Sequence, residues 1–127
     1  MLQNILIVGL GGFIGSAMRY LLNTGIYRLF DYPTFPIGIL IVNVLGCLSI
    51  GFLSGLAESR ELFTSELRLF IFIGFLGGFT TFSSFGYDTF GLVRDSQLGM
   101  AFLNVILHMI IGLGAVWVGF SCSRLLN

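Results

Sequence analysis

The chain has 127 residues, of which 56% are hydrophobic and only 9% are charged, and its formal net charge is zero. A neutral chain with so few charges lacks the basic surface that nucleic acids require, so a nucleic-acid partner is excluded. The charged residues are confined to a few places and leave four uncharged runs, at 1–18, 32–57, 69–87 and 96–123.

Each uncharged run predicts a helix that crosses a membrane, because about 20 apolar residues span the hydrocarbon core of a bilayer. We therefore expect an all-α membrane protein in which residues 1–127 form a single domain of four transmembrane helices. The connecting segments are too short to form a soluble catalytic domain, which argues against an enzyme: Tyr27–Pro36, Glu58–Arg68 and Arg94–Gln97. The first run has no basic leader and no cleavage site, so we expect it to be retained.

The first run contains glycines at positions 9, 12 and 15 that imitate a dinucleotide-binding turn. Such a turn requires alternating strands and helices around it, whereas three more uncharged runs follow here. We interpret the glycines as thinning one face of a membrane helix. Arg19 follows them and either faces a cavity or a partner within the membrane or extends toward the interface.

The second span, Ile37–Leu56, carries Asn43 near its centre. An amide at this depth either joins helices by hydrogen bonding or lines a path in which its N–H groups solvate an anion. Cys47 lies in the same span and Cys122 in the fourth, and neither has a second metal- or redox-active residue at a recognisable spacing. Both cysteines are interpreted as small buried hydrophobic residues.

The third span contains an unusually polar segment, Gly77-Gly78-Phe79-Thr80-Thr81-Phe82-Ser83-Ser84-Phe85-Gly86. Non-helical backbone is tolerated at membrane depth only where protein or a water-filled path receives it. We expect the third helix to be broken here, near the bilayer centre, at a conduction or ion site. Phe82 and Phe85 share one face, and the positive edges of their rings could replace part of an anion's hydration without binding it too tightly to leave.

The fourth span places Asn104 and His108 one helical turn apart on one face. This stripe is either a pore lining or a seam between helices. It is not a metal site, since no second histidine, cysteine or acid shares the face. Asp88, which follows the polar segment and lies close to Arg94 in sequence, is interpreted as an interfacial charge at a helix end.

The distribution of arginines gives almost no orientation signal. If the spans alternate, three arginines fall on one side and two on the other, and the chain has no lysine to add to either side. Because basic residues set orientation, we predict insertion in both directions and an antiparallel homodimer. Glycine pairs spaced four apart favour close helix contacts and support a pore at a subunit boundary: Gly11 and Gly15, Gly51 and Gly55, and Gly74 and Gly78.

Three segments, 11–20, 38–46 and 77–85, together resemble the Fluc (CrcB) fluoride channel family, in order and along the whole chain. The resemblance implies a passive, fluoride-selective channel in the bacterial inner membrane. It further implies an antiparallel dimer with two pores, each walled by both subunits. A structural sodium ion would lie at the dimer centre, held by main-chain carbonyls that map here to Gly77 and Thr80.

Carried onto this sequence, the resemblance assigns Phe82 and Phe85 to the pore, Asn43 to its lining and Arg19 to its vestibule. Ile39 stands where the family often has threonine, and Ser84 replaces another frequent threonine, so the hydroxyl path departs from the family pattern. The complete predicted fluoride-binding set is Phe82, Phe85, Asn43, Ser83, Ser84, Arg19, Asn104 and His108.

Two alternative functions compete with a channel. A small proton-coupled multidrug exporter needs a carboxylate within the membrane, and the four uncharged runs contain none. A non-transporting membrane subunit would explain the glycines but not the polar segment of the third span. A passive fluoride channel requires no nucleotide or organic cofactor.

Overall fold

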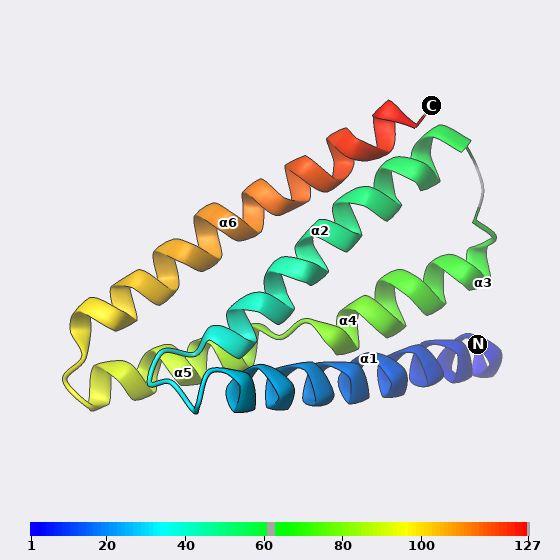
Figure 1. Cartoon of the computed structure of the whole chain (residues 1–127). Helices are drawn as coiled ribbons and strands as arrows, with labels where there is room; N and C mark the ends of the chain where they lie inside the picture. Colours follow the sequence, from blue (N-terminus) through cyan, green and yellow to red (C-terminus); the bar gives the residue numbers. More distant parts are fainter. Residues whose placement is uncertain (61–62, 127) are drawn as a thin grey trace.

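A computed structural model describes residues 1–60 and 63–126, and within these ranges all regular secondary structure is helical, with no strand. Four stretches are long and apolar enough to span a bilayer: Leu2–Leu29, Ile37–Ser59, Ser65–Arg94 and Leu98–Arg124. The predictions of an all-α chain and of four candidate membrane helices are confirmed. The elements in order are α1 (Leu2–Leu29), α2 (Ile37–Arg60), α3 (Ser65–Arg68), the π-helix η1 (Leu69–Leu76), α4 (Gly77–Phe79), α5 (Phe82–Arg94) and α6 (Leu98–Leu125) (Figure 1).

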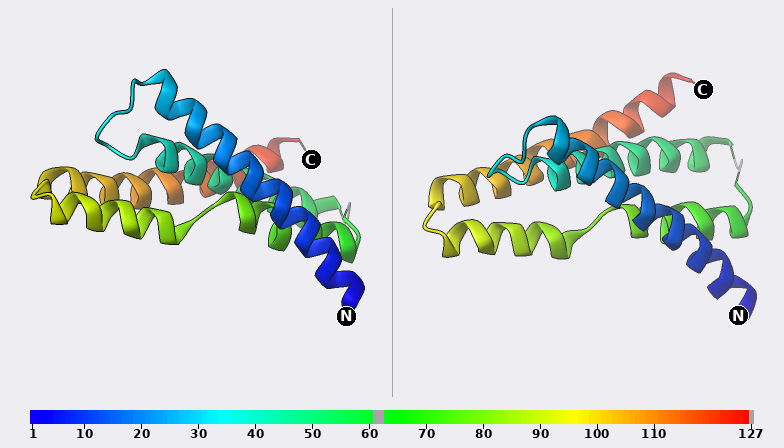
Figure 2. Two further views of the ribbon diagram at one scale, coloured as in Figure 1. Left: turned by 90° about the horizontal axis from the view of Figure 1, so that it is seen from below. Right: turned by 60° about the horizontal axis from the view of Figure 1, so that its bottom comes forward.

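The helices pack as two pairs that are linked through the third span. Helix α2 runs along α6, and α1 runs along η1 and α4 (Figures 1 and 2). Helix α5 then contacts α6, so the third span lies against α1 in its first half and against α6 in its second. The N-terminus and the C-terminus lie at the same end of the molecule (Figure 1), as expected for an even number of spans.

Glycines allow α1 to approach the third span at backbone distance. A Cβ atom at Gly11 would lie 2.5 Å from the Phe70 carbonyl oxygen, and one at Gly15 would overlap the Phe75 carbonyl. On the third span, a Cβ at Gly78 would lie 2.6 Å from the carbonyl oxygen of Gly12 on α1. Only a residue without a side chain fits at these points.

The same device joins α2 to α6. A Cβ at Gly51 would overlap the Val116 carbonyl, and one at Gly119 would overlap the Leu48 carbonyl. The glycine pairs therefore pack helices of one chain against each other. Because these close contacts are made within one chain, the glycine pairs do not by themselves support a pore at a subunit boundary.

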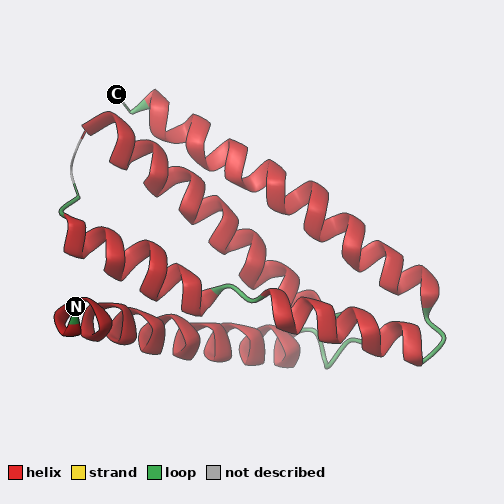
Figure 3. Ribbon diagram, turned by 180° about the vertical axis from the view of Figure 1, so that it is seen from behind, coloured by secondary structure: helices red, strands yellow, loops and turns green. Residues whose placement is uncertain are grey.

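The third span changes backbone conformation between α4 and α5 (Figure 3). Thr80, with φ −82° and ψ 158°, and Thr81, with φ −152° and ψ 115°, are both extended. The Thr81 side chain then caps α5, because its Oγ1 accepts a 3.1 Å hydrogen bond from the backbone N–H of Ser84. These two residues expose main-chain polar groups that other parts of the protein must satisfy.

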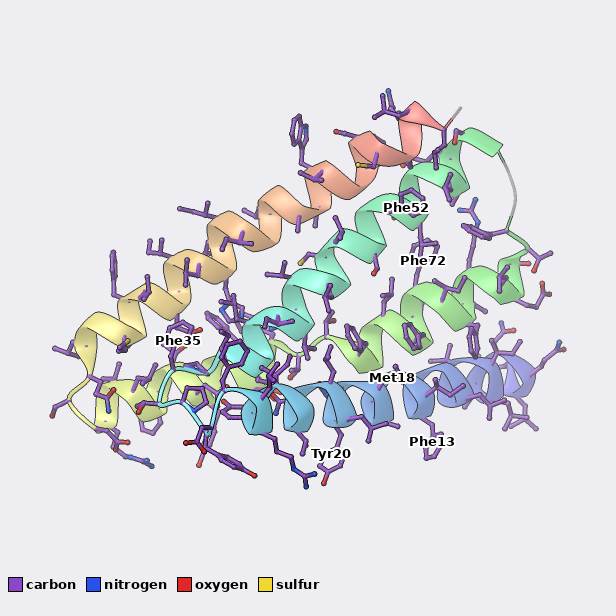
Figure 4. All side chains as sticks on the ribbon, in the orientation of Figure 1. Phe13, Met18, Tyr20, Phe35, Phe52 and Phe72 are labelled. Carbon is purple, nitrogen blue, oxygen red and sulfur yellow. The ribbon has the colours of Figure 1, made fainter. Side chains whose placement is uncertain are left out.

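The exterior is rich in large apolar side chains. Phe13 is 73% exposed and Trp117 is 71% exposed, and Figure 4 shows Phe13 and Tyr20 pointing outward from α1. Cys122 is also exposed, so its interpretation as a buried residue is wrong, whereas Cys47 is half-buried. Hydrocarbon, or a second copy of the chain, can cover such a surface without cost to polar groups.

Candidate ion-conducting site

Asn43 on α2 satisfies the main chain of the third span where it is extended. Its Nδ2 donates to the Thr81 carbonyl oxygen at 3.1 Å, and its Oδ1 accepts from the Thr81 N–H at 2.9 Å. The Thr81 N–H consequently donates to a side chain and not to the carbonyl of Gly77, four residues earlier. Because Thr81 offers one donor and one acceptor, the orientation of the Asn43 amide is fixed.

His108 on α6 joins this pair from the opposite side. Its Nε2 lies 3.3 Å from Asn43 Nδ2, and its Nδ1 lies 2.9 Å from the Asn104 carbonyl oxygen. The imidazole ring also packs on Phe85, with ring centroids 4.4 Å apart. Phe85 in turn packs on Phe82, with centroids 5.5 Å apart. The structure thus brings four of the predicted site residues, from α2, α5 and α6, into one cluster.

The two phenylalanines occupy different environments within the chain. Phe85 is 8% exposed, whereas Phe82 is 80% exposed. Phe85 is held by His108 on one side, and Phe82 is available to whatever covers this surface of the chain.

Asn104 lies in the seam between α5 and α6. It is completely buried, and its Nδ2 donates to Thr89 Oγ1 at 2.9 Å. Thr89 Oγ1 donates to the Phe85 carbonyl oxygen at 2.7 Å. Asn104 on α6 therefore belongs to a seam between helices and not to a pore lining. His108, on the same face, also borders a cavity.

Arg19 contacts the third span from α1. Its Nη1 donates to the Thr80 carbonyl oxygen at 3.3 Å, so the side chain is directed at the extended residues and not at the end of its helix. The Thr80 hydroxyl donates to the Leu76 carbonyl at 2.9 Å. A positive charge therefore lies beside the change in backbone conformation, where it can attract an anion.

Two cavities flank α5 at this point. The first, of about 400 Å³, is mainly apolar; residues that line it include Asn43, Thr80, Thr81, Phe82, Phe85, His108, Cys47, Phe72 and Gly112. The second, of about 410 Å³, is more polar and is lined by Asn23, Tyr27, Ile39, Ser83, Ser84, Tyr87 and Asp88. The cluster around Asn43 thus borders the first cavity, and the serine pair borders the second.

Asp88 is a cavity residue that the sequence interpretation missed. Its Oδ2 and the Oδ1 of Asn23 are buried without a hydrogen-bond partner among the described residues. Arg94, expected near it, instead pairs with Asp95 at 3.1 Å. The sequence spacing could have indicated this position, because Ser84 and Asp88 are four residues apart and therefore lie on the same face of a helix.

The described residues contain no group of three or more histidine, cysteine or acidic side chains that could hold a metal ion.

These features define a small four-helix membrane protein with a polar cluster buried between its helices. The chain belongs to the CrcB family: the model of "CrcB-like protein, Camphor Resistance (CrcB)" matches residues 6–120. It is 46% identical over 115 residues to the "Fluoride-specific ion channel FluC" of Parabacteroides distasonis, covering 91% of this chain and 88% of that protein. The proteins of the same name from Geobacter sulfurreducens and Methylobacillus flagellatus are 42% and 37% identical, covering 97% and 98% of this chain and 98% and 97% of theirs.

Proposed function

We propose that this protein is a passive, fluoride-selective ion channel, and not an enzyme, in the bacterial inner membrane. Family membership and the names of relatives that match nearly the whole chain support this function. The structural observation that carries it is the cluster of Asn43, Phe82, Phe85 and His108 beside two threonines in extended conformation. Four membrane-length helices fit a multi-pass location.

We further propose that the helix interruption lies near the bilayer centre and that the ion passes along α5. Ser83 and Ser84 line the polar cavity, and Phe82 and Phe85 line the mainly apolar cavity together with Asn43. Hydroxyls, amide N–H groups and ring edges each offer partial positive charge, which replaces hydration without trapping the ion. Ile39 also lines the polar cavity, and because isoleucine has no hydroxyl, this position offers none to the ion.

The direction of transport follows from acid–base chemistry and the membrane potential. Neutral hydrogen fluoride crosses lipid and ionises in the less acidic cytoplasm, which traps the anion. A passive channel releases it, because an inside-negative potential contributes about 2.3 kcal/mol per elementary charge per 100 mV.

Fluoride release from liposomes tests this function. We expect the purified chain in liposomes to release fluoride down its gradient when a potassium diffusion potential is imposed, and to release far less chloride under identical conditions. Ion-selective electrodes measure both anions, and protein-free liposomes give the background. Release that requires a proton gradient or ATP would indicate a coupled transporter, the alternative represented by a small multidrug exporter.

We propose an antiparallel homodimer with dual topology as the functional unit. The even arginine distribution supports it, as does the large exposed apolar surface that includes Phe82. Each of two pores would then be walled by residues of both copies. A cysteine-free variant with one cysteine added at the C-terminus should be labelled by a membrane-impermeant reagent to about half its total in sealed cells; complete labelling, or none, contradicts dual insertion.

We also propose a structural sodium ion at the centre of this dimer, held by the carbonyl oxygens of Gly77 and Thr80 from both copies. Gly77 supports this assignment because the Thr81 N–H, its usual helical partner, donates elsewhere. Thr80 already accepts from Arg19 at 3.3 Å, so sodium must use its second lone pair or displace the guanidinium. An experimental structure of the dimer in sodium, with no ion density on the two-fold axis, would refute this proposal.

A further inference from the structure

Both N–H groups of the Asn43 amide are already engaged. One is directed at the Thr81 carbonyl oxygen at 3.1 Å and the other at His108 Nε2 at 3.3 Å. An amide nitrogen carries two hydrogens and no more. A fluoride ion that is solvated by Asn43 must therefore displace one of these two acceptors.

The geometry identifies which acceptor gives way. Thr81 and Asn43 are joined by two reciprocal hydrogen bonds, so releasing the Thr81 carbonyl would disturb the second bond as well. His108 is joined to Asn43 by one contact only, and this contact is the longest of the three. Displacing His108 is the less costly choice, because it breaks one weak bond and leaves the main chain satisfied.

The protonation pattern of His108 is fixed by its other neighbour. Nδ1 faces the Asn104 carbonyl oxygen at 2.9 Å, and a carbonyl can only accept, so Nδ1 carries the proton. Nε2 faces an N–H donor of Asn43 and must be the unprotonated acceptor. A 180° rotation of the Asn43 amide cannot reverse this arrangement. It would place the amide oxygen against the Thr81 carbonyl oxygen and the amide N–H groups against the Thr81 N–H.

We propose that His108 Nε2 competes with fluoride for one N–H of Asn43 and so weakens fluoride binding at that position. This inference rests on the proposed channel function and assigns His108 a role as a positioning residue, acting on the ion through Asn43. A site that conducts must release its ion. An acceptor that reoccupies the donor as the ion departs lowers the cost of leaving that donor unpaired in a buried site.

Nitrogen-15 spectra of the protein in bilayers test the geometry without a flux measurement. His108 is the single histidine of the chain, so its two ring nitrogens are observed without overlap. At neutral pH we expect a neutral ring with the proton on Nδ1. Addition of sodium fluoride should weaken the hydrogen bond to Nε2 and leave Nδ1 protonated, whereas sodium chloride should change neither nitrogen. A proton on Nε2, or a spectrum that fluoride leaves unchanged, would overturn the proposal.

A matched pair of variants tests the competition through flux. His108→Leu removes the acceptor and keeps apolar bulk against Phe85, whereas His108→Gln keeps an uncharged acceptor. We expect the fluoride concentration for half-maximal flux to fall at least about threefold in His108→Leu and to stay within about twofold of the parent in His108→Gln. Equal half-saturation in the parent and in His108→Leu would refute the competition. A parent protein that releases no fluoride would instead refute the proposed channel function. If His108→Leu does not fold, the nitrogen spectra of the parent still decide the hydrogen-bond geometry.

Discussion

Phe82→Ile and Phe85→Ile are each expected to reduce fluoride flux by at least about tenfold while leaving the protein assembled. Isoleucine keeps apolar bulk but has no ring, so the substitution removes the positive ring edges proposed to face the ion. Fluoride release from liposomes measures the effect, and size-exclusion chromatography of the same preparations verifies assembly.

The structure separates the two substitutions by their expected effect on stability. Phe82 is 80% exposed within the chain, so Phe82→Ile removes little intrachain packing beyond its ring contact with Phe85. Phe85 is 8% exposed and packs on His108, so Phe85→Ile should cost more, about 1–2 kcal/mol for a change between large apolar residues. A loss of flux in Phe82→Ile at unchanged thermal stability would therefore be the clearest sign that the ring contacts the ion.

Phe79→Ile provides the control for this pair. Phe79 is as buried as Phe85 but lies before the two extended threonines and stacks on Phe75, with centroids 5.9 Å apart. We expect this variant to lose some stability and still conduct fluoride. If all three variants conducted like the parent, the phenylalanines would be packing residues and the proposed ion path would be wrong.

Gly15→Ala is expected to have the largest effect on the fold. The added Cβ would overlap the Phe75 carbonyl and approach the Phe79 backbone nitrogen to 2.9 Å, and neither backbone group can move aside as a flexible side chain could. Overpacking of this kind typically costs about 1–3 kcal/mol. The shift of α1 would also move Arg19, one turn further along the helix, away from the Thr80 carbonyl. Thermal unfolding in detergent and fluoride flux should both decline.

Gly9→Ala is the matched control on the same helix. A Cβ at Gly9 meets no atom within 4 Å, and alanine favours a helix over glycine by about 1 kcal/mol. We expect this variant to be as stable as the parent or slightly more so. Equal stability of Gly15→Ala and Gly9→Ala would show that α1 and the third span are not in backbone contact.

The sequence contained enough information to predict the helices and to point to the polar segment. Hydrophobic run length is a local property, and about 20 apolar residues have few alternatives to a membrane helix. The run of hydroxyls between Thr80 and Ser84 is equally local, so the third span could be identified as the unusual one. Helix periodicity also placed Asn104 and His108 on one face, where both are buried, and Phe82 beside Phe85, whose ring it contacts.

Tertiary structure decided which of these residues meet. Asn43 contacts His108 across 65 positions of sequence, and Arg19 contacts Thr80 across 61. Such contacts depend on how far each helix is rotated about its axis, and that rotation is set where glycines let α1 and α2 approach their partners. Periodicity fixes the relative directions of side chains on one helix, but it carries no information about the rotation of the next. For this reason the partners of the glycine pairs, the inward position of Asp88 and the engagement of both Asn43 N–H groups could be learned only from the packed structure.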